Sequence, residues 1–278
     1  MQDKKMQVIY KYCDCDTALK ILKGPSILFN NPLHFNDPFD SLMDIDLSNR
    51  NKQDWENYFQ KHGIPKSLWD ELYKQVELGE LKQTERNFKK QITTIRVSCF
   101  SENNDNILLW SHYSKYHTGV CLGFKVYNEY ESNCLHFNSE DLSGFDDYSL
   151  LAKGILPLLK VEYSNDKPYP FNPITDNPER VMEFIRKKSR SWEYENEYRI
   201  PIYRKHINLP DQRAVRLESH MEIDSIIFGV NNDHKDMEKI IQTINQFPDN
   251  GNWIKLYRAD KNRMKYKIDI TEYHSFHH

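Results

Sequence analysis

Glycine is scarce in this chain. The 278 residues include 9 glycines, about half the usual share of roughly 7%. The phosphate-binding loops of the common nucleotide folds need glycine, because their backbone approaches the anion with no side chain between. The sequence contains neither G-x-G-x-x-G nor G-x-x-x-x-G-K-[ST]. The composition therefore speaks against a Rossmann or P-loop nucleotide site.

Long apolar runs and paired cysteines are missing as well. No run approaches the roughly 18 apolar residues of a membrane span, and the N-terminal stretch MQDKKMQVIYKY lacks the apolar core of a signal peptide. We therefore expect a cytoplasmic protein with no membrane partner. The 5 cysteines are odd in number and form no CxxC pair, so the pattern indicates free thiols and neither a disulfide framework nor a zinc ribbon.

Aromatic residues, by contrast, are plentiful. The chain has 17 Tyr, 14 Phe and 5 Trp, and each ring can bury roughly 150–250 Å². These rings offset a hydrophobic share of 38% and a mean hydropathy of -0.80, which favours a folded protein. The net charge of -3 creates no overall field that would collect nucleic acid or anionic membrane.

The order of periodic segments predicts an α+β fold with mixed, mainly antiparallel sheets and flanking helices. We expect one domain over 1–278, with a helical insertion at 50–92 that carries no chemical motif. The predicted strands are Val8–Tyr12, Ile27–Phe29, Ile95–Phe100, Val120–Val126, Tyr194–Tyr203, Ser225–Val230, Trp253–Tyr257 and Met264–Ile270. The predicted helices are a short one capped by Asp16 or Thr17 and ended by Gly24, then Ile107–Tyr116, Pro178–Ser191 and Asp233–Gln246.

The most informative stretch is WEYENEYRI, which begins at Trp192. On a strand, Glu193, Glu195, Glu197 and Arg199 share one face. Carboxylates two residues apart lie roughly 6.6 Å from each other on a strand, so both can address one ligand. The pattern favours a binding or catalytic site; the alternative is a solvated face of Glu and Arg neighbours.

Hydroxyl and aromatic side chains follow in other segments. The predicted strand at 95–100 carries Ser98 and is followed by Ser101, whose hydroxyls can orient a substrate or cap the next helix. That helix carries Trp110 and Tyr113, which we interpret as core or pocket wall.

The first strand contains a lysine between two rings, Tyr10-Lys11-Tyr12. Such a lysine is usually a surface charge. If the strand lines a cleft, however, Lys11 can bind phosphate.

These motifs together resemble the bacterial family of unknown function DUF2971. The resemblance runs from Tyr10 to about Gly229 and implies no assigned reaction. It rests on the ordered segments Tyr10-Lys11-Tyr12, Phe35-Asn36-Asp37-Pro38-Phe39-Asp40, Cys99-Phe100-Ser101-Glu102, Trp110-Ser111-His112-Tyr113, Gly119-Val120-Cys121-Leu122-Gly123-Phe124 and Trp192 to Arg199.

The chain also resembles, more distantly, the ADP-ribosyltransferases. Those enzymes present an Arg or His on the first strand, a Ser or Tyr on a strand that precedes a helix, and an E-x-E or Q-x-E pair on a late strand. Here Lys11, then Ser98 or Ser101, then Glu195-x-Glu197 follow that order, with lysine as the departure. A lysine ammonium does not have the planar, forked donor geometry of arginine, so this chain would contact NAD differently at the first position.

This second resemblance implies an enzyme that uses NAD as a substrate, needs no metal, and modifies an unknown acceptor, protein or nucleic acid, in bacterial or phage defence or as a toxin. The implied roles are stabilisation of the oxocarbenium charge by Glu197, positioning of the acceptor by Glu195, orientation of the glutamate by Ser98 or Ser101, stacking on nicotinamide by rings such as Tyr12 and Trp110 with Tyr10 and Tyr113 nearby, and contact with the pyrophosphate by Lys11 or Arg199.

Two alternatives remain open at this point. Asp37 and Asp40 could join Glu195 and Glu197 in holding Mg²⁺ for a metal-dependent nuclease. The Glu and Arg face could instead recognise a partner protein without catalysis. A pocket around Glu195 favours an enzyme, and a flat surface there favours the binding module.

Overall fold

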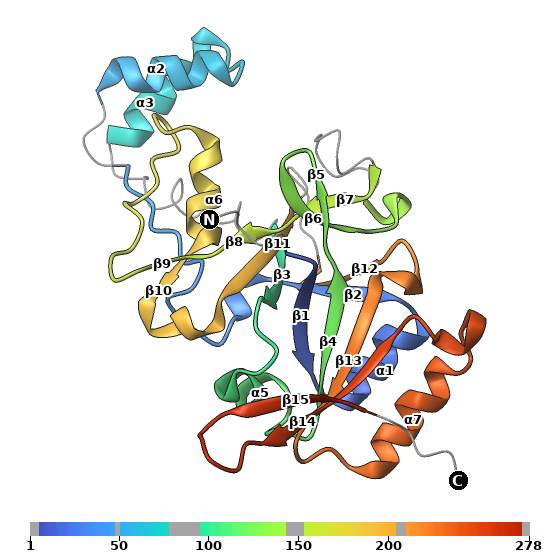
Figure 1. The fold of residues 1–278 in the computed structure, drawn as a ribbon. Coiled ribbons are helices and arrows are strands. Elements are labelled where there is room, and N and C mark those ends of the chain that lie inside the picture. The colour runs from blue at the N-terminus through green and yellow to red at the C-terminus, as the bar shows by residue number, and fades with distance from the viewer. Residues whose placement is uncertain (1–5, 48–50, 78–94, 143–152, 204–209, 274–278) are drawn as a thin grey trace.

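The structure is a computed structural model that describes residues 6–47, 51–77, 95–142, 153–203 and 210–273. A large twisted sheet forms its centre (Figure 1). The strands follow each other in the order β12 (Gln212–Arg216), β2 (Ser26–Asn30), β3 (Ile95–Ser101), β1 (Val8–Cys13), β4 (Val120–Lys125), β13 (Ile223–Phe228), β14 (Lys255–Lys261) and β15 (Ile268–Glu272). A branch, β11 (Glu197–Tyr203), pairs with β3 and with β8 (Leu159–Lys160).

All of these neighbours pair antiparallel except β13 and β14, which are parallel. Two small sheets accompany the large one. The antiparallel sheet contains β5 (Tyr127–Glu129), β6 (Ser132–His136) and β7 (Ile155–Pro157), and the parallel pair contains β9 (Glu162–Ser164) and β10 (Lys187–Ser189). The predicted α+β class with mixed, mainly antiparallel sheets is confirmed.

Two helices cover one face of the large sheet. Figure 1 shows α1 (Cys15–Lys23) beside α7 (His234–Ile244). Their buried side chains join the largest apolar cluster, which includes Leu22 and Ile240 together with Leu122 of β4. The alternate residue Cys121 belongs to a second cluster on the opposite face, with Trp110 of α5 (Ile107–Tyr113). Period-2 alternation along β4 thus separates two cores.

The sheet opens between β1 and β3. β1 pairs with β4 along six residues, but with β3 only at Tyr10 and Ser101. β3 continues instead along β11, from Glu197 opposite Ser101 to Tyr203 opposite Ile95. The divergence of β1 from β3 leaves room for side chains between the two strands.

Local signals placed most elements within a few residues. Asp14, not Asp16 or Thr17, caps α1 and accepts a hydrogen bond from the backbone N–H of Thr17 at 2.6 Å. Gly24 ends that helix as expected. Glycine is also required at position 119, just before β4, because a Cβ there would lie 2.2 Å from the carbonyl oxygen of Cys13.

The segment 178–196 differs from the prediction of a long helix followed by a strand. It forms η5 (Pro178–Arg180), α6 (Val181–Arg186), β10 and the 3₁₀ helix η6 (Arg190–Glu195). The Ser189 side chain caps η6 by accepting a bond from Ser191, and Asn196 ends it with φ of 42°. β11 therefore begins at Glu197, and the predicted strand start at Tyr194 is wrong.

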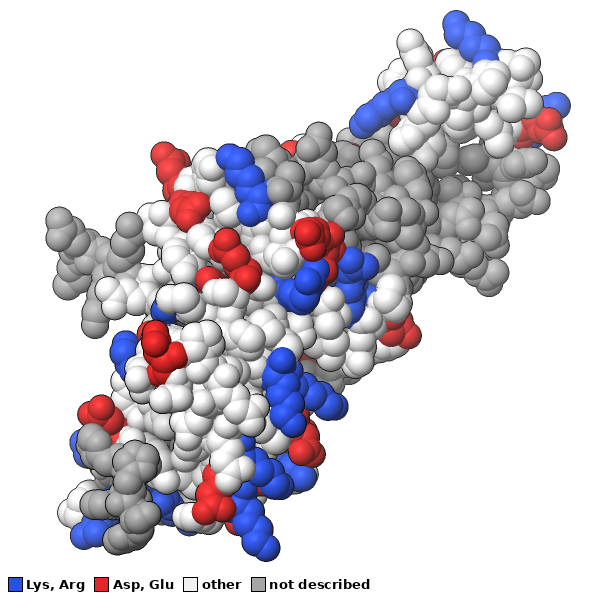
Figure 2. Space-filling view, turned by 90° about the vertical axis from the view of Figure 1, so that its right-hand side faces the viewer, with Lys and Arg blue, Asp and Glu red and all other residues white. Residues whose placement is uncertain are grey.

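Within the predicted helical segment 50–92, the described residues form α2 (Lys52–Lys61) and α3 (Trp69–Glu77). Figure 1 shows the two helices away from the large sheet. Residues 50 and 78–92 of that segment lie outside the described residues. Among the described helices, none has the length and apolar character that a bilayer crossing requires. On the face drawn in Figure 2, acidic and basic side chains are interspersed.

Candidate functional site

A pocket lies where the large sheet opens between β1 and β3. Its cavity volume is about 280 Å³, close to the lower end of the roughly 300–1,000 Å³ range of small-molecule sites. Its walls combine rings, amides and charged groups from distant parts of the chain. The lining residues are Tyr10, Lys11, Tyr12, Asn30, His34, Phe35, Asn36, Asp40, Val97, Cys99, Phe100, Ser101, Leu109, Tyr113, Lys188, Glu195 and Glu197.

The Glu195 and Glu197 carboxylates reach the pocket through a chain reversal. Glu195 is the last residue of η6 and Glu197 the first of β11, with the left-handed Asn196 between them. The hydroxyl of Ser101 donates a 2.6 Å hydrogen bond to the Glu195 carbonyl oxygen, which holds this corner against β3. Both carboxylates are buried, and a single ammonium, that of Lys188, joins them: its Nζ lies 2.5 Å from Glu195 Oε2 and 2.8 Å from Glu197 Oε2.

Arg199 lies behind Glu197, away from the pocket. Its Nε is 2.7 Å from Glu197 Oε1, and its two terminal nitrogens contact Asp40 at 2.8 and 2.6 Å. The Ile185 carbonyl oxygen accepts a further bond at 2.8 Å. Arg199 is fully buried, so its donors serve the protein and not a ligand.

The buried charges do not balance. Three carboxylates, those of Asp40, Glu195 and Glu197, share two cations, Lys188 and Arg199. Burial would raise the pKa of Glu197, but Arg199 and Lys188 lower it to about 2. Burial does raise the pKa of Glu195, against the opposing effect of Lys188. Of the two neighbouring carboxyls, Glu195 therefore holds its proton to higher pH, and their pKa values move apart.

Glu195 also contacts the wall of the pocket. The Tyr113 hydroxyl donates to Glu195 Oε1 at 2.8 Å and accepts from the Asn36 side-chain amide at 3.2 Å. Burial and the adjacent Glu195 carboxylate raise the pKa of Tyr113, so its proton stays available for this bond. The bond in turn favours the ionised form of Glu195.

Lys11 reaches across the opening between β1 and β3. Its Nζ donates to the Ser98 hydroxyl at 3.1 Å and to the Cys99 carbonyl oxygen at 2.9 Å, and it lies 4.9 Å from the centre of the Phe100 ring. Because an ammonium has three donors, one remains for a ligand in the pocket. Burial lowers the pKa of Lys11, which is expected of a cation held without a close carboxylate.

The structure brings together seven of the ten residues to which the resemblance to ADP-ribosyltransferases assigns a role. They are Tyr10, Lys11, Tyr12, Ser101, Tyr113, Glu195 and Glu197. Three do not reach the pocket lining: Ser98 is buried as the partner of Lys11, Trp110 is buried edge-on against Tyr12, and Arg199 is buried beneath Glu197. In those places Trp110 cannot stack on a ligand, and Arg199 cannot meet a pyrophosphate.

Glu193 was expected on the same face as Glu195 and Glu197. Its side chain is instead 59% exposed and pairs with Arg190 within η6. The reason is local: on a 3₁₀ turn, residues two apart do not share a face as they do on a strand. The proximity of Glu195 and Glu197 therefore comes from the turn at Asn196 and not from strand alternation.

Sequence reasoning missed Lys188. The basic run Arg186–Arg190 reads as the solvated end of a helix, yet Lys188 lies on β10, with a side chain only 4% exposed. Burial opposes its charge, but Glu197 and Glu195 raise the pKa of Lys188. The basic residues on either side hid Lys188, because nothing in the local sequence pattern separates it from its neighbours.

The space between the carboxylates is already filled by protein cations. Lys188 contacts Glu195, Glu197 and, at 3.6 Å, Asp40 Oδ2. Asp37 does not join them through any of these bonds; its Oδ1 accepts from the backbone N–H of Phe39. A Mg²⁺ ion would have to displace Lys188, so the arrangement disfavours the metal-dependent nuclease alternative.

The comparison with known families gives one match. Residues 109–200 match the family described as Protein of unknown function (DUF2971). The match confirms the predicted resemblance to this family over that segment, which runs from α5 into β11 and contains Tyr113, Lys188, Glu195 and Glu197. A search of curated proteins and a search of solved structures found no match.

Proposed function

We propose that this chain is an ADP-ribosyltransferase-like enzyme that cleaves the nicotinamide–ribose bond of NAD and transfers the ADP-ribose to an acceptor. One observation carries the proposal: Lys11, Ser101 and the Glu195-x-Glu197 pair, which lie far apart in the sequence, line one pocket. A role in bacterial or phage defence, or as a toxin, is the setting that the resemblance implies.

The reaction needs a place for developing positive charge. As the bond between the ribose C1′ and the nicotinamide nitrogen breaks, its electron pair leaves with neutral nicotinamide and the ribose becomes an oxocarbenium ion. The acceptor then forms a new bond to C1′ and loses a proton. A site for this chemistry requires an anion beside the ribose and a base beside the acceptor.

The two glutamates fit these two requirements differently. Glu197, with its pKa near 2, stays ionised and can stabilise the oxocarbenium ion. Glu195, whose pKa is raised by burial, is the better proton acceptor, because a base works best when its pKa approaches the working pH. Glu195 also has fewer protein donors than Glu197, so more of its oxygen lone pairs remain for a ligand.

The remaining walls suit the other parts of NAD. Lys11 has a donor to spare for a phosphate oxygen, and the rings of Tyr10, Phe35 and Tyr113 can stack on nicotinamide. The cavity of about 280 Å³ takes only part of a dinucleotide. The adenosine end would therefore extend from the mouth of the pocket.

The direct test is nicotinamide release, followed by chromatography after incubation of the full chain with NAD and candidate protein or nucleic-acid acceptors. Glu195→Gln should lower the rate by about 10²–10⁴-fold, the usual contribution of a general base. Glu193→Gln is the matched control, because Glu193 lies two residues away with an exposed side chain; its rate should equal that of the unmodified chain.

Two results would overturn the proposal. One is the absence of nicotinamide release with every acceptor together with the absence of NAD binding by calorimetry. The other is an equal rate in the Glu195→Gln and Glu193→Gln variants. Nucleic-acid cleavage that depends on added Mg²⁺ would instead support the nuclease alternative.

A further inference from the structure

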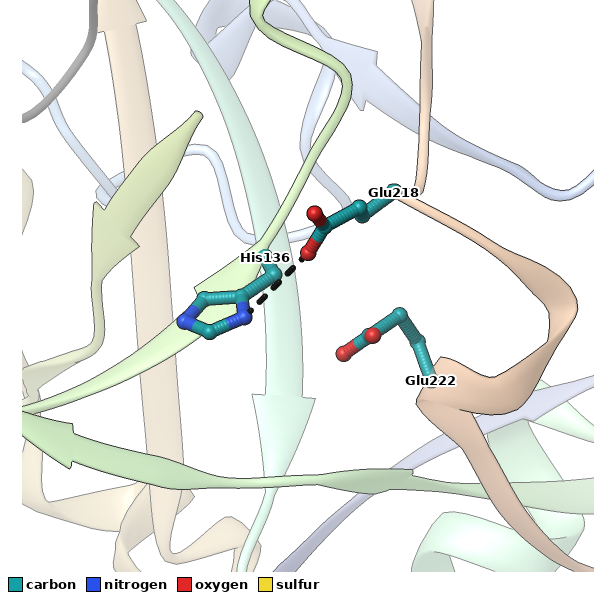
Figure 3. Close-up of side chains that lie close together, drawn as sticks. All are labelled: His136, Glu218 and Glu222. Atoms are coloured by element: carbon teal, nitrogen blue, oxygen red, sulfur yellow. Dashed lines mark ion pairs between the residues drawn. The ribbon is translucent and has the colours of Figure 1, made fainter. Parts of the chain in front are cut away.

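A second cluster of titratable groups lies outside the pocket, and its core is His136, Glu218 and Glu222. Figure 3 shows the three side chains facing one another. One ligand atom from each lies within 4.8 Å of the other two. His136 ends β6, Glu218 follows β12, and Glu222 ends the 3₁₀ helix η7 (His220–Glu222). We call these three residues the His136 cluster; none of them lines the pocket.

The imidazole of His136 is held in a definite orientation. The Tyr127 ring stacks on it at 3.9 Å with an interplanar angle of 5°. Nε2 lies 3.0 Å from Glu129 Oε1, and Nδ1 lies 3.4 Å from Glu218 Oε2. If Nε2–H donates to Glu129, the Nδ1 lone pair of a neutral ring faces a carboxylate. That arrangement is repulsive unless a proton or another cation lies between them.

Glu222 supplies an independent indication. The residue is only 5% exposed, and its Oε2 has no hydrogen-bond partner within the described part of the chain. The other oxygen, Oε1, accepts a long bond of 3.4 Å from the Tyr127 hydroxyl. A buried carboxylate oxygen without a partner is costly. A proton on His136 Nδ1 would pair with Glu218 and leave Glu222 Oε2 unsatisfied.

We propose that His136 Nδ1 and the carboxylates of Glu218 and Glu222 bind one divalent transition-metal ion of the Zn²⁺ type, with Glu129 as the hydrogen-bond partner that orients the histidine. One nitrogen and two carboxylate oxygens are a ligand set that zinc accepts, with water in the remaining position. The contact between Nε2 and Glu129 is the carboxylate–histidine arrangement common behind metal-bound imidazoles.

The geometry requires only a small adjustment. Zinc bonds to nitrogen and oxygen are about 2.0–2.2 Å long, so ligand atoms around one ion lie roughly 3–4 Å apart. Atoms within 4.8 Å of one another come to that spacing by modest side-chain rotation. The Glu218 side chain is 64% exposed and free to rotate.

A metal ion at this site would link two parts of the fold. β6 belongs to the small antiparallel sheet, whereas Glu218 and Glu222 lie in the connection between β12 and β13 of the large sheet. The two segments are already joined by the hydrogen bond from the Glu218 N–H to the His136 carbonyl oxygen at 3.2 Å. The ion would add a second link between the sheets.

The test uses the full chain after treatment with a chelator. Titration with ZnCl₂ by calorimetry at pH 7 should show one tight site, and thermal unfolding should shift to higher temperature with zinc. Glu222→Gln and Glu218→Gln should each weaken that site at least tenfold and remove the thermal shift. Glu131→Gln is the control, because Glu131 is an exposed carboxylate on the neighbouring turn; it should behave as the unmodified chain does.

Glu218→Gln keeps the test decisive if the buried Glu222 variant fails to fold, since Glu218 is mostly exposed. The proposal is overturned if the unmodified chain takes up no zinc, or if both variants bind it as tightly as the control does. Either result would leave His136 with its contacts to Glu129 and Glu218 and no bound ion. The test does not measure nicotinamide release, so its result is independent of the proposed enzyme activity.

Discussion

Arg199 and Asp40 form a two-point ion pair across 159 residues of sequence, with Nη1 to Oδ1 at 2.8 Å and Nη2 to Oδ2 at 2.6 Å. Their side chains are 0% and 2% exposed. The pair ties the turn that contains Asp40 to β11, where Arg199 lies. The same arginine also binds Glu197. The wall of the pocket and its carboxylates are thus parts of one network.

Removing one partner of this pair should be costly. Asp40→Asn breaks the two-point buried ion pair and leaves Glu197 as the carboxylate partner of Arg199, so we expect a loss of about 3–5 kcal/mol in the free energy of unfolding. Asp44→Asn is the control, because the Asp44 side chain is 52% exposed and its contact with Lys167 is long, at 3.9 Å. We expect its free energy of unfolding to change by no more than about 0.5 kcal/mol. Urea unfolding of both variants measures this. Equal losses would contradict the role assigned to the pair.

The ionised form of Glu197 should stabilise the fold in a pH-dependent way. Its pKa is about 2 in the folded chain, against an ordinary value of 4.5. The stabilisation is fully present above the unfolded value and is lost as the pH falls from about 4.5 towards 2; its size is roughly 3 kcal/mol.

Glu197→Gln should therefore be less stable than the unmodified chain at pH 7, and the gap should narrow between pH 4.5 and pH 2. The urea concentration at the midpoint of unfolding, measured for both chains at several pH values, reports this difference. Glu193→Gln should track the unmodified chain throughout. A stability difference that stays constant with pH would show that Arg199 and Lys188 do not lower the pKa of Glu197.

Tyr113 should tune the pKa of Glu195. Its hydroxyl hydrogen bond favours the ionised carboxylate, so Tyr113→Phe should raise the pKa of Glu195 further. If Glu195 is the base, the acidic limb of the pH–rate profile for nicotinamide release should move to higher pH. Tyr116→Phe, at a residue that is 78% exposed, should leave the limb in place. A limb unmoved in both variants would remove Glu195 from the role of base.

Lys11 should contribute to binding more than to stability. Burial lowers its pKa, which means that the fold disfavours the charge at neutral pH. Lys11→Met should weaken NAD binding by about tenfold to a hundredfold, the worth of a hydrogen bond to a charged group, without lowering the melting temperature. Lys20→Met, on the exposed side of α1, is the control. Calorimetry and thermal unfolding together would expose a purely structural lysine, because its loss would lower the melting temperature and leave affinity unchanged.

Local sequence predicted much of the framework. The segment Val120–Val126, opened by Gly119, predicted β4, which spans Val120–Lys125. The start of α7 follows its predicted position because Asp233 caps it. Such features depend on neighbours in the chain, namely side-chain period and caps. Lys11, Ser101 and the two glutamates, which were selected because their order along the chain resembles that of ADP-ribosyltransferases, line one pocket in the structure.

The arrangement of the pocket depended on contacts that no local pattern contains. Lys188 looks like any other residue of a basic run, and it becomes the link between Glu195 and Glu197 only because β10 pairs with β9 and turns into η6. Sequence determined the α+β class and most of the candidate residues, since periodicity and composition act over a few positions. Tertiary structure decided which charges are buried together, because the free energy of a buried charge depends on partners that can be 159 residues away.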